Sequence, residues 1–296
     1  MLAELFAVMA PIFIVSGVGY GWVRFGHVYP TDFVTRLILN IGTPCLVLSS
    51  LSSSEIDPRA FGQMAVACVA VTCCMGLIGL LLSRSLRYDW KVLVPAYLFP
   101  NSGNMGLPIS LYAFGEEGLA LAVAFFLVLS LGHFTVGMVL SGAEQSFRKL
   151  LANPIIISLA LALPILLLDL GLPRWLSNTV QLLGGMTIPL MLITLGVSLA
   201  SIRTRQLGQG MLLGALRLLC GASVAWGIGL VLGLSPLALS VLVMQSAMPV
   251  AVLNYLFAVR AGRSPEQVAS LVLCSTFLAF GFLPLLLAWS RLSAMP

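Results

Sequence analysis

Long apolar stretches alternate with short polar joints along nearly the whole chain. Each stretch has roughly the 20 residues that an α-helix needs to cross about 30 Å of hydrocarbon. The pattern therefore predicts an all-α membrane protein with ten transmembrane helices. The predicted spans cover residues 2–22, 32–53, 60–83, 91–114, 118–142, 150–170, 175–200, 209–233, 236–260 and 265–290.

The fourth span is interrupted in its middle by helix-breaking and polar residues. In the sequence YLFPNSGNMGLPISLYAFG the interruption consists of Pro100, Asn101, Ser102, Gly103 and Asn104. Pro100 has no N–H, and its ring excludes the carbonyl of Ala96 from normal helical bonding. The polar side chains can satisfy the backbone groups that this break frees, as a water-free environment requires. We predict a new half-helix that begins near Asn104 and directs its N–H groups toward the middle of the membrane.

The ninth span is interrupted in the same way, by a proline with polar residues near it. Its sequence MQSAMPVAVLNYLFAVRAG contains Gln245, Ser246, Pro249 and, further on, Asn254. Because the ninth span is predicted to run opposite to the fourth, the two second half-helices would approach one point from opposite sides. Each would present the positive end of its helix dipole there, and such a point favours an anion.

Two halves of the chain show a weak internal repeat. The segment LNIGTPCLVLSSL of the second span resembles LGGMTIPLMLITLG of the seventh, and the Pro100 break corresponds to the Pro249 break. Glu117 follows the fourth span and Glu266 follows the ninth, and these two residues are separated by the same number of positions as Pro100 and Pro249. Five spans per half is an odd number, so the second half inserts upside down. We predict two inverted five-helix repeats, residues 1–145 and 146–296, in which helices 4 and 9 are broken and cross.

The basic residues predict the orientation of the chain. The loops after odd-numbered spans carry Arg24, Arg84, Arg87, Lys91, Arg148, Lys149, Arg203, Arg205, Arg260 and Arg263, whereas the other side carries Arg59, Arg174 and Arg291. This asymmetry places the odd-numbered loops in the cytoplasm and both termini outside it. The net charge of +5 therefore reflects orientation and does not indicate nucleic acid as a partner.

Composition agrees with a membrane location and excludes several kinds of site. Hydrophobic residues make up 59% of the chain and charged residues 8%, and the mean hydropathy is +1.06. Such a chain has too few charges to cover a soluble surface. The six cysteines all fall in apolar spans without metal-ligand spacing, so neither a metal site nor a disulfide framework is predicted. No cofactor is expected.

The interrupted spans resemble the auxin efflux carrier family, which includes plant PIN-type auxin transporters and bacterial organic-anion permeases. The segments FPNSGNMGLPISLYAFG, MQSAMPVAVLNYLFAVRAG and LVLCSTFLAFGFLPLLLAW carry the resemblance, which indicates a bacterial member. It implies that helices 4 and 9 cross and that Pro100, Asn101, Gln245 and Pro249 lie at the crossover beside substrate. It also implies a scaffold of helices 1, 2, 6 and 7, a moving transport domain of helices 3–5 and 8–10, and a homodimer formed through the scaffold.

The candidate substrate-binding residues are polar groups at the two breaks. They are Asn101, Ser102, Gly103, Asn104, Gln245, Ser246 and Asn254. Two residues within the spans have alternative interpretations. His133 is either a satisfied interior histidine or a proton carrier, and without it transport would be uncoupled. Arg217 either extends its side chain to the cytoplasmic interface, contacts an anion, or anchors a carbonyl freed by a break.

These features predict an elevator-type secondary transporter in the cytoplasmic (inner) membrane, with a mono- or dicarboxylate as substrate. The resemblance favours small carboxylates such as malonate or malate. A drug/metabolite-type exporter also has ten helices in about 300 residues, but it does not require breaks in spans four and nine. A membrane enzyme is disfavoured because His-Glu-x-x-His, Gly-x-Ser-x-Gly and paired intramembrane aspartates are missing from the sequence. A sensor would need a signalling domain.

Overall fold

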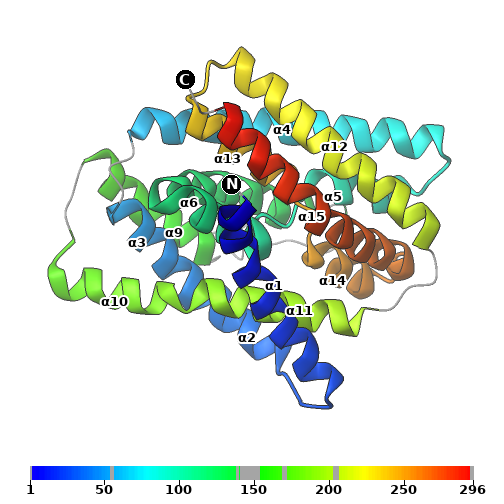
Figure 1. The fold of residues 1–296 in the computed structure, drawn as a ribbon, viewed down its shortest axis with the longest axis horizontal. Helices are drawn as coiled ribbons and strands as arrows, with labels where there is room; N and C mark the ends of the chain where they lie inside the picture. The colour runs from blue at the N-terminus through cyan, green and yellow to red at the C-terminus, as the bar shows by residue number, and fades with distance from the viewer. Residues whose placement is uncertain are drawn as a thin grey trace.

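The computed structural model describes residues 2–53, 57–137, 154–168, 172–202 and 207–293, together with Leu140. Within these residues the chain is helical and has no β-strand (Figure 1). The α-helices are α1 (Leu2–Arg24), α2 (Thr31–Leu37), α3 (Thr43–Ser53), α4 (Pro58–Ser85), α5 (Trp90–Leu98), α6 (Leu107–Gly132), α9 (Pro154–Leu167), α10 (Arg174–Gly185), α11 (Thr187–Ser201), α12 (Leu207–Val231), α13 (Pro236–Ser246), α14 (Val252–Ala261) and α15 (Pro265–Ser293). The π-helical turns are η1 (Ile38–Gly42), η2 (Ser102–Gly106) and η3 (His133–Gly137).

The all-helical fold predicted from the sequence is confirmed for this part of the chain. Seven helical stretches among the described residues are long and apolar enough to cross a membrane, and α9 and α13 contain shorter apolar helices. The count of ten crossings stays a prediction. The predicted boundary between residues 145 and 146 lies outside the described residues, as do Arg148, Lys149, Arg203 and Arg205, four of the cations that the sequence analysis assigns to the cytoplasmic side.

Helix α6 contains the joint between the predicted fourth and fifth spans. Gly115 within it has φ 68° and ψ −162°, a conformation that glycine adopts without the steric penalty of a Cβ. The backbone therefore leaves the helical path at the position where the hydropathy pattern places the end of one span and the start of the next.

The helices pack in two groups. In the first group α1 crosses α11, and α3 lies against α9 and α10 (Figure 1). In the second group α12 lies against α4, α13 and α15, while α4 also covers α5 and α6. Contacts of η2 with α11 and of α6 with α1, α3 and α9 join the two groups. We call these the first packing group (α1–α3, α9–α11) and the second packing group (α4–α6, α12–α15).

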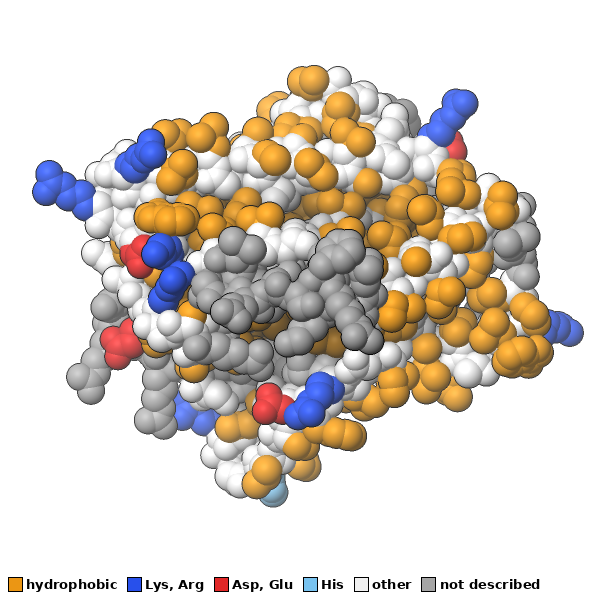
Figure 2. All heavy atoms as spheres, turned by 180° about the vertical axis from the view of Figure 1, so that it is seen from behind, with side chains coloured by type: hydrophobic (Ala, Val, Ile, Leu, Met, Phe, Trp, Pro, Cys, Tyr) orange, Lys and Arg blue, Asp and Glu red, His pale blue; other side chains and the backbone are white. Residues whose placement is uncertain are grey.

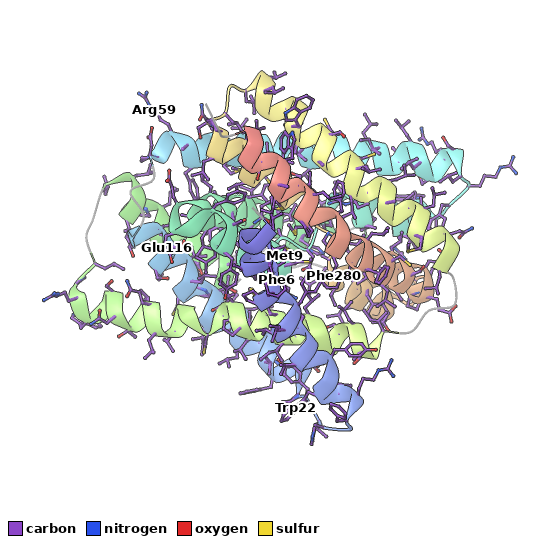
Figure 3. All side chains as sticks on the ribbon, in the orientation of Figure 1. Phe6, Met9, Trp22, Arg59, Glu116 and Phe280 are labelled. Atoms are coloured by element: carbon purple, nitrogen blue, oxygen red, sulfur yellow. The ribbon has the colours of Figure 1, made fainter. Side chains whose placement is uncertain are left out.

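The surface has the distribution of side chains that suits a lipid environment. Figure 2 shows apolar side chains over a broad part of one face, with most lysine and arginine side chains toward its margins. Figure 3 shows Arg59 and Glu116 toward the same end of the molecule, and α1 contacts α15 where Phe13 meets Phe280. The rings of Phe13 and Phe280 lie 4.6 Å apart at this contact.

The segments LNIGTPCLVLSSL and LGGMTIPLMLITLG, which carry the weak repeat, each contain a proline (Pro44 and Pro189) that follows a helical irregularity. The π-helical turn η1 ends one residue before Thr43, and Pro44 follows. In the other half, α10 ends at Gly185 and α11 starts at Thr187, two residues before Pro189. A proline cannot donate the helical hydrogen bond, so a wider turn or a short interruption before it is expected.

Candidate functional site

The two interrupted spans meet at their breaks. Residues 99–101 separate α5 from η2, and residues 247–251 separate α13 from α14. The Asn101 amide donates to the Pro249 carbonyl at 2.7 Å, and the Ala251 amide donates to the Phe99 carbonyl at 3.1 Å. Pro100 and Val250 thereby form an isolated antiparallel β-bridge. Each break thus satisfies backbone groups of the other, which explains how extended backbone is tolerated in the core of an apolar fold.

A cavity of about 90 Å³ adjoins the crossing on one side. The breaks contribute residues 100–104 and 251–253, α6 and η3 contribute Ser130 and His133, and the first packing group contributes residues of α2, η1, α9 and α11. A water needs roughly 10–15 Å³ on this measure, so the cavity can hold several waters or a small organic molecule. None of the described residues that line it carries a formal charge.

Both second half-helices begin at this cavity. The turn η2 starts at Ser102, two residues earlier than predicted, and α14 starts at Val252. Both residues line the cavity. The first N–H groups of a helix have no partner within that helix, and the helix dipole gives them partial positive charge. The cavity therefore has a positive potential from two directions without a cationic side chain.

Asn101 lies at the centre of the arrangement. Its side chain is 4% exposed and lines the cavity, and its Nδ2 group has no hydrogen-bond partner. A buried donor without a partner costs about 1–3 kcal/mol, so it is retained where a ligand or water accepts its hydrogen bond. Ser102, Gly103 and Asn104 line the same cavity.

His133 lines the same cavity as Asn101 and is held by aromatic rings. Its imidazole stacks on Phe99 with the ring centroids 4.2 Å apart and the planes 1° from parallel. Phe257 meets it edge-on at 5.2 Å. His133 is 5% exposed, and its Nε2 has no hydrogen-bond partner. The two rings and a side-chain hydrogen bond with Asn254 hold the histidine in the cavity wall.

Gln245 and Ser246 do not reach the cavity. Gln245 is fully buried, donates from Nε2 to Ser110 Oγ at 3.2 Å, and packs its Oε1 against Gly106, where a Cβ would clash. The Oγ of Ser246 has no partner, while its carbonyl accepts from Arg217. Both residues lie in the last turn of α13, and no residue of this helix lines the cavity.

Asn254 stabilises the break of the other span. Its Nδ2 group donates to the carbonyls of Pro95 and Phe99, at 3.2 and 3.3 Å. The Pro95 carbonyl also accepts from the Phe99 amide, and the Phe99 carbonyl also accepts from the Ala251 amide, so Asn254 is a second donor to each. Asn254 is 5% exposed and does not line the cavity beside Asn101.

Arg217 anchors carbonyls freed by the breaks. It is 1% exposed, so its side chain does not extend to the membrane interface. Its Nε donates to the Ala96 carbonyl at 3.2 Å and its Nη1 to the Ser246 carbonyl at 2.8 Å. Of the three interpretations of this residue, the anchoring one agrees with the geometry, and Arg217 is not part of the cavity wall.

Hydroxyl groups opposite the breaks were not identified from the sequence. Thr31 and Thr35 of α2 and Thr194 and Ser198 of α11 line the cavity. Thr194 Oγ1 lies 2.8 Å from the Tyr29 hydroxyl. Burial raises the pKa of Tyr29, and the hydrogen bond to Thr194 lowers it to a smaller extent. Thr31 and Thr35 are four residues apart, as are Thr194 and Ser198. Residues at this spacing lie on the same face of a helix, and this pattern within an apolar span could have identified them.

Comparison with known proteins agrees with this architecture. A family model described as a membrane transport protein matches residues 5–141 and 135–287. The chain is 29% identical, over 270 residues, to an uncharacterized transporter of Methanothermobacter thermautotrophicus, with 87% of each protein covered. The resemblance to auxin efflux carriers is thereby confirmed, and a drug/metabolite-type exporter, an enzyme or a sensor receives no support. This chain belongs to the membrane transport protein family that includes the auxin efflux carriers.

Proposed function

We propose that this protein is a secondary transporter that carries a small organic anion, a mono- or dicarboxylate, across the cytoplasmic membrane. The observation that carries the proposal is the cavity at the crossing, where the unpartnered Nδ2 of Asn101 lies beside the N-terminal ends of two half-helices. A carboxylate accepts hydrogen bonds from amide N–H groups and is attracted to positive helix ends.

Within this proposal the polar residues have different roles. Asn101, Ser102 and Asn104 contact the carboxylate, Gly103 brings the backbone close to it, and His133 contacts the ligand from the cavity wall. Gln245, Ser246 and Asn254 would support the break, because they are buried outside the cavity wall and Asn254 donates to the Pro95 and Phe99 carbonyls. Pro100 and Pro249 create the breaks.

We further propose ten crossings in two inverted repeats. Support comes from the antiparallel pairing of the two breaks and from the match of the family model to two successive segments. The first packing group would be the scaffold and the second the moving domain, since the cavity lies between them. A homodimer would form through the first packing group. Its exposed apolar residues, such as Phe6 and Leu182, are equally suited to contact lipid.

In the proposed orientation the cavity would communicate with the cytoplasm. Thr31 begins α2, and Ser198 lies in the last turn of α11. The distribution of basic residues assigns both helix ends to the cytoplasmic side, and both residues line the cavity. Elevator movement of the second packing group would expose the same cavity to the other side.

A ligand screen followed by flux measurements tests the proposal. Purified protein is heated with a panel of mono- and dicarboxylates, and each carboxylate that raises the melting temperature is tested for flux in liposomes. The methyl ester of each such compound is the matched control, because it keeps the carbon skeleton and loses the charge. We expect flux for an acid and much less stabilisation by its ester. Equal stabilisation by acid and ester, or no flux of any stabilising acid, would contradict anion transport.

A further inference from the structure

The interrupted helices have two kinds of ends, and only the N-terminal ends lie at the cavity. The C-terminal ends of α5 and α13 do not line the cavity, and Arg217 of α12 donates to a carbonyl at each of them. Arg217 is among the largest side chains that are fully buried in the described part of the chain. Both of its hydrogen bonds go to backbone carbonyls, those of Ala96 and Ser246.

The chemistry of these two carbonyls explains why an arginine is suited to the position. The last carbonyls of a helix have no donor within the helix and carry the negative end of the dipole. Pro100 cannot donate to the Ala96 carbonyl, and Ser246 is the last residue of α13. A guanidinium group presents several N–H donors in one plane and keeps its charge, so one side chain can serve both ends.

The surroundings of Arg217 bring it close to both helix ends. The Tyr97 hydroxyl donates to the Leu213 carbonyl at 2.9 Å, so α12 is joined to α5 one turn before Arg217. One turn after it, Gly221 faces the end of α13. A Cβ at Gly221 would clash with the Ser246 carbonyl and lie 2.7 Å from Nη1 of Arg217. The lack of a side chain at this position allows the guanidinium and the end of α13 to meet.

We propose that Arg217 is a positioning residue that holds the C-terminal ends of α5 and α13 together. By fixing these ends, its guanidinium keeps the N-terminal ends of η2 and α14 converged on the cavity. Its consequence for transport rests on the proposed function, whereas its effect on the crossing can be measured without any ligand. The residue acts behind the site and does not contact the substrate.

Amide hydrogen exchange, measured by mass spectrometry on the purified protein, reports on the crossing directly. The amides of Asn101 and Ala251 are the two that donate across the breaks. Gly221→Ala inserts a methyl group between Arg217 and the Ser246 carbonyl. Gly227→Ala is the matched control, because the same change on the same helix meets no atom within 4 Å. Arg217→Ala and Arg217→Lys complete the set, with peptides of α1 as an internal reference.

We expect exchange at both break segments to accelerate by about tenfold or more in Gly221→Ala and Arg217→Ala, the effect of losing one charge-assisted hydrogen bond. Gly227→Ala should match the wild type, and Arg217→Lys should be intermediate because it keeps the charge but loses the planar fork. Added guanidinium ion should restore protection in Arg217→Ala, a rescue that general destabilisation would not show.

Two results would overturn the proposal. One is wild-type exchange at both segments in Gly221→Ala and Arg217→Ala; the other is acceleration at one segment alone, since Arg217 would then serve a single helix end. If Arg217→Ala does not yield folded protein, the pair Gly221→Ala and Gly227→Ala decides the question by the same criteria. A wild-type protein that neither binds nor moves carboxylates would contradict the transport proposal, while the exchange result would still decide the role of Arg217.

Discussion

Replacing Asn101 by alanine separates ligand binding from stability. The Nδ2 group of Asn101 has no partner in the protein, so its removal breaks no intramolecular hydrogen bond of that group. A hydrogen bond to a charged ligand contributes about 1.5–3 kcal/mol, and each 1.4 kcal/mol is tenfold in affinity. Asn101→Ala should therefore weaken carboxylate binding by roughly 10- to 140-fold. Because an unpaired buried donor is destabilising, the melting temperature without ligand should stay the same or rise slightly.

The assay compares three alanine variants by titration calorimetry and thermal melting. Asn178→Ala changes an exposed asparagine of α10 that does not line the cavity, and it should resemble the wild type in both measurements. Asn254→Ala removes the donor to the Pro95 and Phe99 carbonyls and should lower the melting temperature. Of the two buried asparagines, Asn101 is thus expected to affect ligand binding and Asn254 the stability of the fold.

One outcome would refute this reasoning. If Asn101→Ala binds the carboxylate with wild-type affinity while folding normally, Asn101 does not contact the ligand, and the cavity argument fails. If Asn101→Ala instead melts far below the wild type, the side chain holds the break together, and its Nδ2 is not free for a ligand.

Three further predictions concern coupling, histidine and topology. Replacing Na⁺ by K⁺ should leave ligand affinity and flux unchanged. The carbonyls at the end of α5 accept hydrogen bonds from Arg217 and Asn254 and are therefore not available to coordinate Na⁺. A strong dependence on Na⁺ in flux assays would contradict this. His133→Phe should keep the aromatic stack and the melting temperature. It should weaken carboxylate binding by about 2- to 10-fold, because a neutral hydrogen bond contributes about 0.5–1.5 kcal/mol. Unchanged affinity would show that His133 does not contact the ligand. A membrane-impermeant thiol reagent should label Arg59→Cys from outside the cell and Arg87→Cys only after permeabilisation, and the reverse pattern would invert the topology.

Much of the site could be located from local sequence because the two breaks result from the covalent structure of proline. Pro100 lacks an N–H wherever it stands, and Pro249 does so in the other span, so both interruptions were predictable. The new helical segments start at Ser102 and Val252, two and three residues after these prolines. Their location in one wall of a cavity agrees with the expectation that they converge.

The roles of the neighbouring polar residues were not predictable in the same way. Gln245 and Ser246 precede Pro249 much as other polar residues follow Pro100, yet they are buried outside the cavity wall. Which side of a half-helix faces the cavity depends on how the helix is rotated against its neighbours, and hydropathy carries no signal for this when all sides are buried. For the same reason the hydroxyls of Thr35 and Thr194 escaped notice, since both were read as parts of apolar spans.

The sequence by itself determined that the chain is a helical membrane protein with two interrupted spans, because hydrophobic length and the missing N–H of proline act locally and in any context. Only the tertiary structure decided what satisfies the freed backbone groups. Arg217 lies 121 residues from Ala96 in sequence and Asn254 lies 155 residues from Phe99, yet both donate to carbonyls at or just after the end of α5. Such pairings depend on where distant helices pack, and that is a property of the assembled fold.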